Sequence, residues 1–232
     1  MDATQFFHHL QEEVLAHPAI CSGFAAQMEQ AQGFDRAHAQ RFALAYYAHI
    51  LHTRRYQAHA LAIAPDERVQ FALAQILADE YGNGDPEATH MALYRRFLRG
   101  VGCDETAIEA ATEPLIPEVR LYIDAMMAYT RCGDWLAAAA AVGIAMEWPI
   151  PALYRRFLVA LRQIPEIEER ALELFTSHIT IDEAHSEWMR QALTPHASTP
   201  EGQARIAAGV RYNLDARWVL MEGLSRYVFG AR

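Results

Sequence analysis

Apolar residues recur along most of the chain at intervals of three and four, the spacing that places side chains on one face of an α-helix. No stretch alternates convincingly between apolar and polar residues, as a half-buried β-strand would. Proline and glycine divide the pattern into segments, and Asp35 and Asp66 stand where a helix N-cap is expected. We therefore predict an all-α fold, with helices over about residues 4–16, 20–32, 35–63, 66–81, 87–99, 117–130, 134–161, 167–193 and 203–229.

Two features add detail to this pattern. Pro149 and Pro151 predict an irregularity inside the helix over 134–161, because proline lacks the N–H that continues a helix. The heptapeptide Ala-Leu-Tyr-Arg-Arg-Phe-Leu occurs twice, at 92–98 and at 152–158. This repeat is either a chance match in a chain rich in Arg and Ala or the trace of a bundle built from two related halves.

The composition is that of a folded globular chain. Of its 232 residues, 52% are hydrophobic and 21% are charged, and no segment looks like a linker, so we predict a single domain over 1–232. The longest apolar run, 136–146, is shorter than the roughly 20 residues that span a bilayer, and no secretory signal is recognisable. The three cysteines are widely spaced and form no Cys-x-x-Cys pair. We expect a cytoplasmic protein with no membrane partner.

The charged residues exclude some activities. The formal net charge is -9, whereas a nucleic-acid-binding protein presents a basic patch, so we expect no nucleic-acid partner. All 20 basic residues are Arg, because the sequence contains no Lys. A lysine Schiff base and a lysine nucleophile are therefore excluded.

The most informative local motif is formed by His178, Asp182 and His185. On a helix, separations of four and seven residues place three side chains on one face, since each residue turns the helix by about 100°. Two imidazoles and a carboxylate on one face are a typical arrangement of metal ligands, and Asp-x-x-His resembles the carboxylate-x-x-His element of di-iron helix bundles. The alternative is a solvated polar face that carries two incidental histidines.

Other carboxylates and a third histidine extend the candidate site. Glu87 and His90 form a second carboxylate-x-x-His element, and Glu80 precedes the glycine-rich segment before it. Glu147 lies in an apolar segment, where a buried carboxylate is costly unless it binds a metal or pairs with an Arg. Glu87 and Glu147 each precede their copy of the heptapeptide by five positions. Oxygen and imidazole ligands without a thiolate suit iron or manganese.

This set of residues resembles the heme-oxygenase-like di-iron oxidases and oxygenases. The segment Asp-Glu-Tyr-Gly-Asn-Gly-Asp-Pro-Glu-Ala-Thr-His at 79–90 is similar to the first ligand motif of that family, and the resemblance covers about 35–190. It implies a heme-oxygenase-like bundle of about seven or more helices. It also implies that two Fe²⁺ ions are bound, the first by Glu80, His90 and His178 and the second by Glu147, Asp182 and His185. Glu87 is either a further ligand or a residue that contacts one.

The resemblance implies an oxidoreductase that uses O2. We expect C–H cleavage, oxidative decarboxylation or C–C fragmentation of a small amino acid or carboxylic acid in specialised metabolite (natural product) biosynthesis. The related p-aminobenzoate synthases need a lysine, and Phe157 stands at that position here. The N-oxygenating relatives add a carboxylate from the helix over about 40–63, which contains no Asp or Glu.

Two alternatives remain open. One is N-oxygenation of an amine at the same di-iron site, and the other is a metal-free member of the superfamily that binds a small molecule. The superfamily also contains heme oxygenase, thiaminase II and the pyrroloquinoline-quinone synthases, which share the fold without this metal set. The resemblance further implies a homodimer. The expected pocket walls are Tyr47, Met146, Trp148 and Tyr154, and the candidates for binding a substrate carboxylate are Arg54, Arg55, Arg155 and Arg156.

Overall fold

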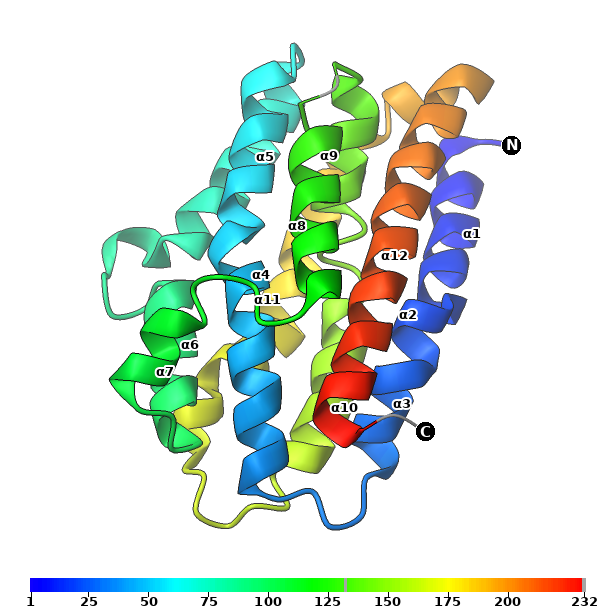
Figure 1. The fold of residues 1–232 in the computed structure, drawn as a ribbon. Coiled ribbons are helices and arrows are strands. Elements are labelled where there is room, and N and C mark those ends of the chain that lie inside the picture. The colour runs from blue at the N-terminus through cyan, green and yellow to red at the C-terminus, as the bar shows by residue number, and fades with distance from the viewer. Residues whose placement is uncertain (132, 231–232) are drawn as a thin grey trace.

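The computed structural model describes residues 1–131 and 133–230, apart from the side chain of Glu183. Every regular element in these residues is a helix, so the predicted all-α fold is confirmed (Figure 1). In chain order the elements are α1 (Ala3–Ala16), α2 (Pro18–Cys21), α3 (Gly23–Gln30), α4 (Arg36–Ile63), α5 (Glu67–Glu80), η1 (Gly82–Gly84), α6 (His90–Gly100), α7 (Glu105–Ala110), α8 (Pro117–Tyr129), α9 (Trp135–Gly143), α10 (Ile150–Leu161), η2 (Glu169–Leu172), α11 (Glu173–Leu193), η3 (His196–Ser198) and α12 (Pro200–Phe229).

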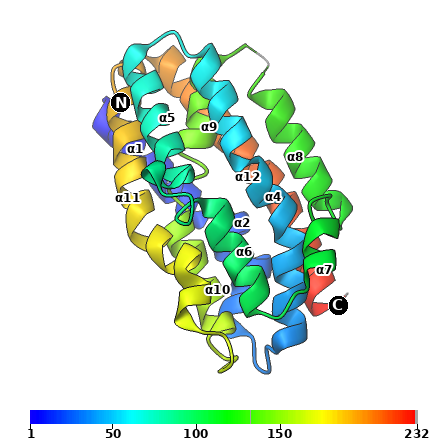
Figure 2. The ribbon, with the colours of Figure 1, turned by 90° about the vertical axis from the view of Figure 1, so that its left-hand side faces the viewer.

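The long helices α4 and α12 organise the bundle. Helix α4 packs against α5, α8, α9 and α12, and α12 packs in addition against α3, α8 and α9. Helix α11 packs against α5, α6 and α10. Figure 2 shows α11 and α8 at opposite sides of the bundle, with α4 between them. Side chains from α4, α5, α6, α10 and α11 therefore meet in the interior.

The most apolar helix, α9, is a close-packed centre of the fold. The five alanines at 137–141 are buried, and across from them Gly209 of α12 lies so close that an added Cβ would stand 2.0 Å from the Ala137 carbonyl oxygen. Small side chains on both helices permit this approach. At nine residues α9 is too short to span a bilayer, and in the part of the chain that the structure describes no helix combines the required length and apolarity.

Several predicted helix boundaries are corrected. The helix predicted over 87–99 begins only at His90, because Thr89 is its N-cap and accepts a hydrogen bond from the Ala92 N–H at 3.1 Å. The irregularity predicted inside the helix over 134–161 is present as a complete break. Turns at 144–149 separate α9 from α10, and Pro151 lies in the first turn of α10. The segments 20–32 and 167–193 are likewise divided, α12 begins at Pro200, and the short α7 was not predicted.

The two copies of the heptapeptide occupy similar environments in α6 and α10. Each copy buries its Tyr and its Phe, and Phe97 of the first and Tyr154 of the second contact the same ring, Phe175 of α11, at centroid separations of 4.9 Å. Both helices pack against α11. The repeat thus places aromatic side chains on two sides of the helix that carries the His178 motif.

Candidate metal centre

A glycine-containing turn connects the end of α5 to the start of α6. Gly82, Asn83 and Gly84 all have positive φ, and a Cβ on Gly82 would stand 2.8 Å from the Thr89 backbone nitrogen. Only glycine allows the turn to fold this closely onto the residues before α6. The turn therefore directs His90, the first residue of α6, toward Glu80, the last residue of α5.

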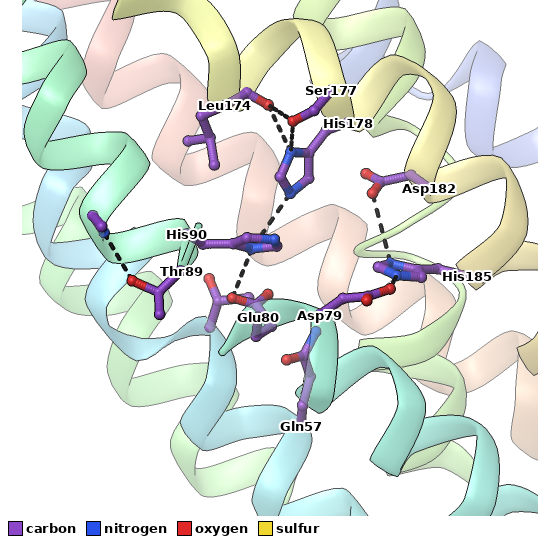
Figure 3. A network of polar contacts seen from close by, with 12 residues as sticks. Gln57, Asp79, Glu80, Thr89, His90, Leu174, Ser177, His178, Asp182 and His185 are labelled. Atoms are coloured by element: carbon purple, nitrogen blue, oxygen red, sulfur yellow. Dashed lines mark hydrogen bonds and ion pairs between the residues drawn. The ribbon is translucent and has the colours of Figure 1, made fainter. Parts of the chain in front are cut away.

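Glu80, His90 and His178 form the first group of donors (Figure 3). The Nδ1 atom of His90 lies 2.8 Å from Glu80 Oε2 and 3.3 Å from His178 Nε2. His178 donates from Nδ1 to the Leu174 carbonyl oxygen at 2.6 Å, which leaves its Nε2 as an acceptor. A carboxylate oxygen and two imidazole nitrogens thus converge, and a single proton on His90 Nδ1 is shared between two acceptors.

Glu147, Asp182 and His185 form the second group, in which one donor atom from each residue lies within 4.8 Å of the others. His185 Nδ1 is 3.2 Å from Glu147 Oε2 and 3.7 Å from Asp182 Oδ1. Its other nitrogen, Nε2, is 2.6 Å from Asp79 Oδ2. Gln57 of α4 donates to Glu147 Oε1 at 3.3 Å. Asp79 and Gln57 therefore orient two members of this group from outside it.

The environment shifts the titration of both groups. Burial lowers the pKa of His178 well below its ordinary value, and the neighbouring His90 lowers it further. Burial also raises the pKa of Asp182 well above its ordinary value, an effect that the Glu147 carboxylate reinforces. Burial alone would lower the pKa of His185, but the hydrogen bonds and charges of Glu147 and Asp79 outweigh it and raise the pKa to about 9. Without metal, bound protons therefore offset the negative charge of these carboxylates. A bound divalent cation would offset that charge more strongly.

The donors suit a divalent metal. Glu80, Glu147 and Asp182 are at most 7% exposed, and no Arg side chain among the described residues lies within 4 Å of their carboxylates. The predicted alternative of an Arg ion pair for Glu147 is therefore not what the structure contains. Asp182 Oδ1 is buried without a hydrogen-bond partner among the described residues. Carboxylates grouped with imidazoles in a buried site, without a thiolate, suit iron or manganese.

The structure brings together six of the seven predicted ligands. Five of them, Glu80, His90, Glu147, His178 and Asp182, line one cavity of about 50 Å³, and His185 contacts two of the carboxylates beside it. Glu87 is separate from the group. It is exposed in the turn before α6, because the helix that would have carried it inward begins three residues later.

The expected pocket walls are only partly those of the cavity. Met146 and Tyr154 line it. Trp148 instead lines an open groove of about 610 Å³ beside α1, which reaches Asp182 from the other side. Tyr47 does not face the cavity, because its hydroxyl accepts a hydrogen bond from Arg95 Nε at 2.8 Å and its ring stacks on Tyr94. The neighbouring Tyr46 lines the cavity in its place.

None of the four arginines proposed to bind a carboxylate reaches the cavity. Arg54 stacks over the Tyr81 ring, Arg55 lies 3.5 Å from His52, and Arg156 contacts the Cys21 carbonyl and Glu29. Arg155 is exposed and lines the outer groove.

Arg217 of α12 lines the cavity instead, together with His49 of α4. The sequence contained a signal for it, since Arg217 follows the buried Val210 and Asn213 at helical spacing and so belongs to the inward face of α12. Asp79 and Gln57 gave no comparable signal, because their roles depend on contacts between helices.

The chain is similar in sequence to known proteins. Residues 40–218 match the sequence profile of a family of iron-containing redox enzymes. The chain is 27% identical over 220 residues to the pyrroloquinoline-quinone synthase of Pseudomonas entomophila (strain L48), covering 94% of this chain and 82% of that protein. It is 26% identical over 156 residues to the 4-aminobenzoate synthase of Nitrosomonas europaea, covering 67% of this chain and 61% of that protein.

Solved structures share the fold. A CADD-like protein of unknown function from Nostoc punctiforme PCC 73102 matches with a TM-score of 0.77 and 16% identity, covering 98% of this chain and 96% of that one. A domain with a heme oxygenase-like fold from Shewanella denitrificans OS217 matches with a TM-score of 0.71 and 15% identity, covering 100% of this chain and 97% of that one. The expected heme-oxygenase-like fold is therefore confirmed.

Proposed function

Because the chain belongs to the family of iron-containing redox enzymes, we propose that it is a non-heme di-iron oxidase or oxygenase that uses O2. Its substrate is a small amino acid or carboxylic acid, which undergoes C–H cleavage, decarboxylation or fragmentation in a biosynthetic pathway. The observation that carries the proposal is the pair of donor groups, Glu80, His90 and His178 beside Glu147, Asp182 and His185, at one buried cavity.

The residues of the chain have defined tasks in this proposal. Ferrous iron, when bound, supplies the activation of O2 and the oxidation of a substrate carbon. Leu174 fixes the ring of His178 through its Nδ1, so that Nε2 faces His90 and Glu80. Asp79 accepts a hydrogen bond from His185 Nε2, and this leaves Nδ1 directed at Glu147 and Asp182. The aromatic and aliphatic walls, which include Tyr46, Met146, Ile150 and Tyr154, exclude water from the reacting carbon.

Two observations favour carbon oxidation over the neighbouring chemistries. Helix α4 contributes Tyr46, His49, Ile50 and Thr53 to the cavity and has no Asp or Glu, whereas the N-oxygenating relatives add a carboxylate there. The lysine that the aminobenzoate synthases need has no counterpart, because the chain contains no Lys. Phe157 stands at that position and is fully buried against the rings of Phe24 and Phe42.

The test is an anaerobic titration of the metal-free protein with Fe²⁺, followed by rapid mixing with O2 in the presence of candidate amino and carboxylic acids. We expect about two iron ions per chain and a transient visible absorption band whose decay one class of acid accelerates. Protein that takes up no iron would instead be a metal-free binding member of the superfamily. Uptake of iron without a reaction with O2 would also contradict the proposed oxidase.

A further inference from the structure

Arg217 is an unusual residue at this site. Its side chain is 1% exposed, in the middle of α12, and its Nε and Nη1 atoms have no hydrogen-bond partner among the described residues. No described carboxylate lies within 4 Å of the guanidinium, although Tyr122 is close enough for a hydrogen bond. A buried guanidinium is always charged and costs free energy when its N–H groups are unpaired. Packing alone therefore does not explain why an Arg occupies this position.

The residues around Arg217 indicate which kind of group could bind its guanidinium. It lines the same cavity as Glu80, His90, Glu147, His178 and Asp182, so its charge faces the space beside the candidate metal ligands. His49, 4% exposed, lines that cavity too and has an unpartnered Nδ1. Burial and, to a smaller extent, the charge of Arg217 lower the pKa of His49 to about 3, so His49 is neutral. Apart from Thr53, the remaining walls are apolar or aromatic.

We propose that Arg217 binds the carboxylate of the substrate inside this cavity, which makes the substrate a short monocarboxylic acid. The inference deepens the proposed function and rests on it for the identity of the site. An anion supplies the hydrogen-bond acceptor that the N–H groups of Nε and Nη1 lack, and hydrogen bonds to an ionised acceptor are among the stronger ones in proteins. One guanidinium balances one carboxylate. The small volume, about 50 Å³, favours a short chain.

Arg217 would then place the substrate relative to the metal ligands. With its carboxylate at Arg217 and its carbon chain between Tyr46 and Tyr154, the substrate would lie along the cavity that the ligands line. In the metal-free protein Glu147 and Asp182 repel an anion, so iron and the acid are expected to bind cooperatively. Arg217 is a substrate-binding residue in this account, and the metal ions are held without it.

The test compares carboxylate binding by four proteins loaded anaerobically with Fe²⁺: wild type, R217M, R217K and R226M. Arg226 is the matched control because it lies on the same helix but is half exposed and pairs with Glu118. Isothermal titration uses formate, acetate and propionate, with propionamide as the uncharged counterpart of propionate and octanoate as a long acid. Iron content and thermal unfolding are measured on the same samples.

We expect wild type and R226M to bind the short acids equally, and propionamide and octanoate to bind at least about 10-fold more weakly than propionate. R217M should lose about 10-fold to 100-fold in affinity while it keeps its iron, and R217K should fall between the two. R217M should unfold at no lower temperature than wild type, because an unpaired buried charge has been removed. If R217M does not fold, R217K carries the comparison.

Two results would overturn the inference. The first is short-acid binding by R217M within about twofold of wild type, which would place the carboxylate elsewhere, for example on the iron. The second is the absence of short-acid binding by folded, iron-loaded wild type. Failure of the proposed function is distinguishable, because it would appear as missing iron. Arg217-dependent acid binding by a protein without iron would leave the subsite standing and remove the oxidase proposal.

Discussion

The two donor groups of the candidate metal centre are held in place differently. In the first, Glu80, His90 and His178 have one carboxylate for two imidazoles, and a backbone carbonyl of α11 fixes His178. In the second, Glu147 and Asp182 share a single imidazole, which in addition contacts Asp79. Asp182 also leaves one buried oxygen unpaired.

The difference indicates how each group depends on a cation. Hydrogen bonds can hold the first group in nearly its binding geometry without metal. The second group concentrates negative charge, which only protons offset when metal is absent, so it gains more from a divalent ion. Substitutions in one group or the other are therefore expected to have effects of different size.

The largest effect is expected from Asp182→Asn. The substitution removes a carboxylate from the second group alone, so iron uptake should fall from about two ions to about one per chain, with loss of O2-dependent turnover. The metal-free variant should be more stable than wild type by about 1–3 kcal/mol at pH 8, because a buried, partly unpaired charge is gone.

Iron analysis and denaturant unfolding at pH 8 measure both effects. Glu187→Gln is the control on the same helix, since Glu187 forms a partly exposed pair with Arg190. Retention of two tightly bound irons by the Asp182 variant would show that this residue is not a ligand.

A pH effect of comparable size should appear in the metal-free protein. The pKa of His185 is raised from 6.5 to about 9, so its protonated form stabilises the fold fully below pH 6.5 and this stability is lost as the pH rises toward 9. The loss should reach up to about 3 kcal/mol. The raised pKa of His90 acts in the same direction. The lowered pKa values of His49 and His178 act only below pH 6.5, where they reduce stability as the pH falls.

Urea unfolding of metal-free protein between pH 6.5 and 9 measures this slope, and His185→Gln should flatten it. A stability that is constant or increases over that range would contradict the described charge balance of the second group.

A smaller effect is expected from Asp79→Asn. The variant keeps every proposed ligand but weakens the acceptor that directs His185 Nδ1 toward Glu147 and Asp182. Loss of such an outer contact typically lowers metal affinity about 10-fold to 100-fold, so two irons should still bind at saturation. Competition with a chelator measures the affinity of each site. Equal weakening of both sites would argue against a role specific to the second group.

The smallest effect is expected from Glu87→Gln. Glu87 is exposed in the turn before α6, so its loss should change iron affinity by less than about twofold and leave the iron count unchanged. The same titrations measure it beside Glu147→Gln, the residue at the equivalent distance from the other heptapeptide. A loss of iron in the Glu87 variant would mean that the turn closes on the metal.

Glu87 and Glu147 also show what a sequence pattern can and cannot predict about the site. Both stand five positions before the same heptapeptide, yet one is exposed and the other is buried. The spacing could not distinguish them, because the local structure depends on Thr89, which begins α6 late, and on the turns at 144–149, which enclose Glu147. By contrast, the three residues of α11 follow directly from helical periodicity.

Helical periodicity could not predict which residues of different helices contact one another. The approach of Asp79 to His185 and of Gln57 to Glu147 joins residues 106 and 90 positions apart. Tyr46 lines the cavity where Tyr47 was predicted to do so, because neighbouring residues on a buried helix face different sides and both sides of α4 are covered. The all-α fold could be predicted from the local pattern alone. The residues that line the cavity could not, because they depend on how α4 and α12 pack in the bundle.

We propose that two irons occupy the two separate donor groups. The most direct measurement is anomalous diffraction at the iron edge from crystals grown with Fe²⁺ under anaerobic conditions. We expect two peaks, one among Glu80, His90 and His178 and one among Glu147, Asp182 and His185. A single peak, or iron bound outside these residues, would contradict it.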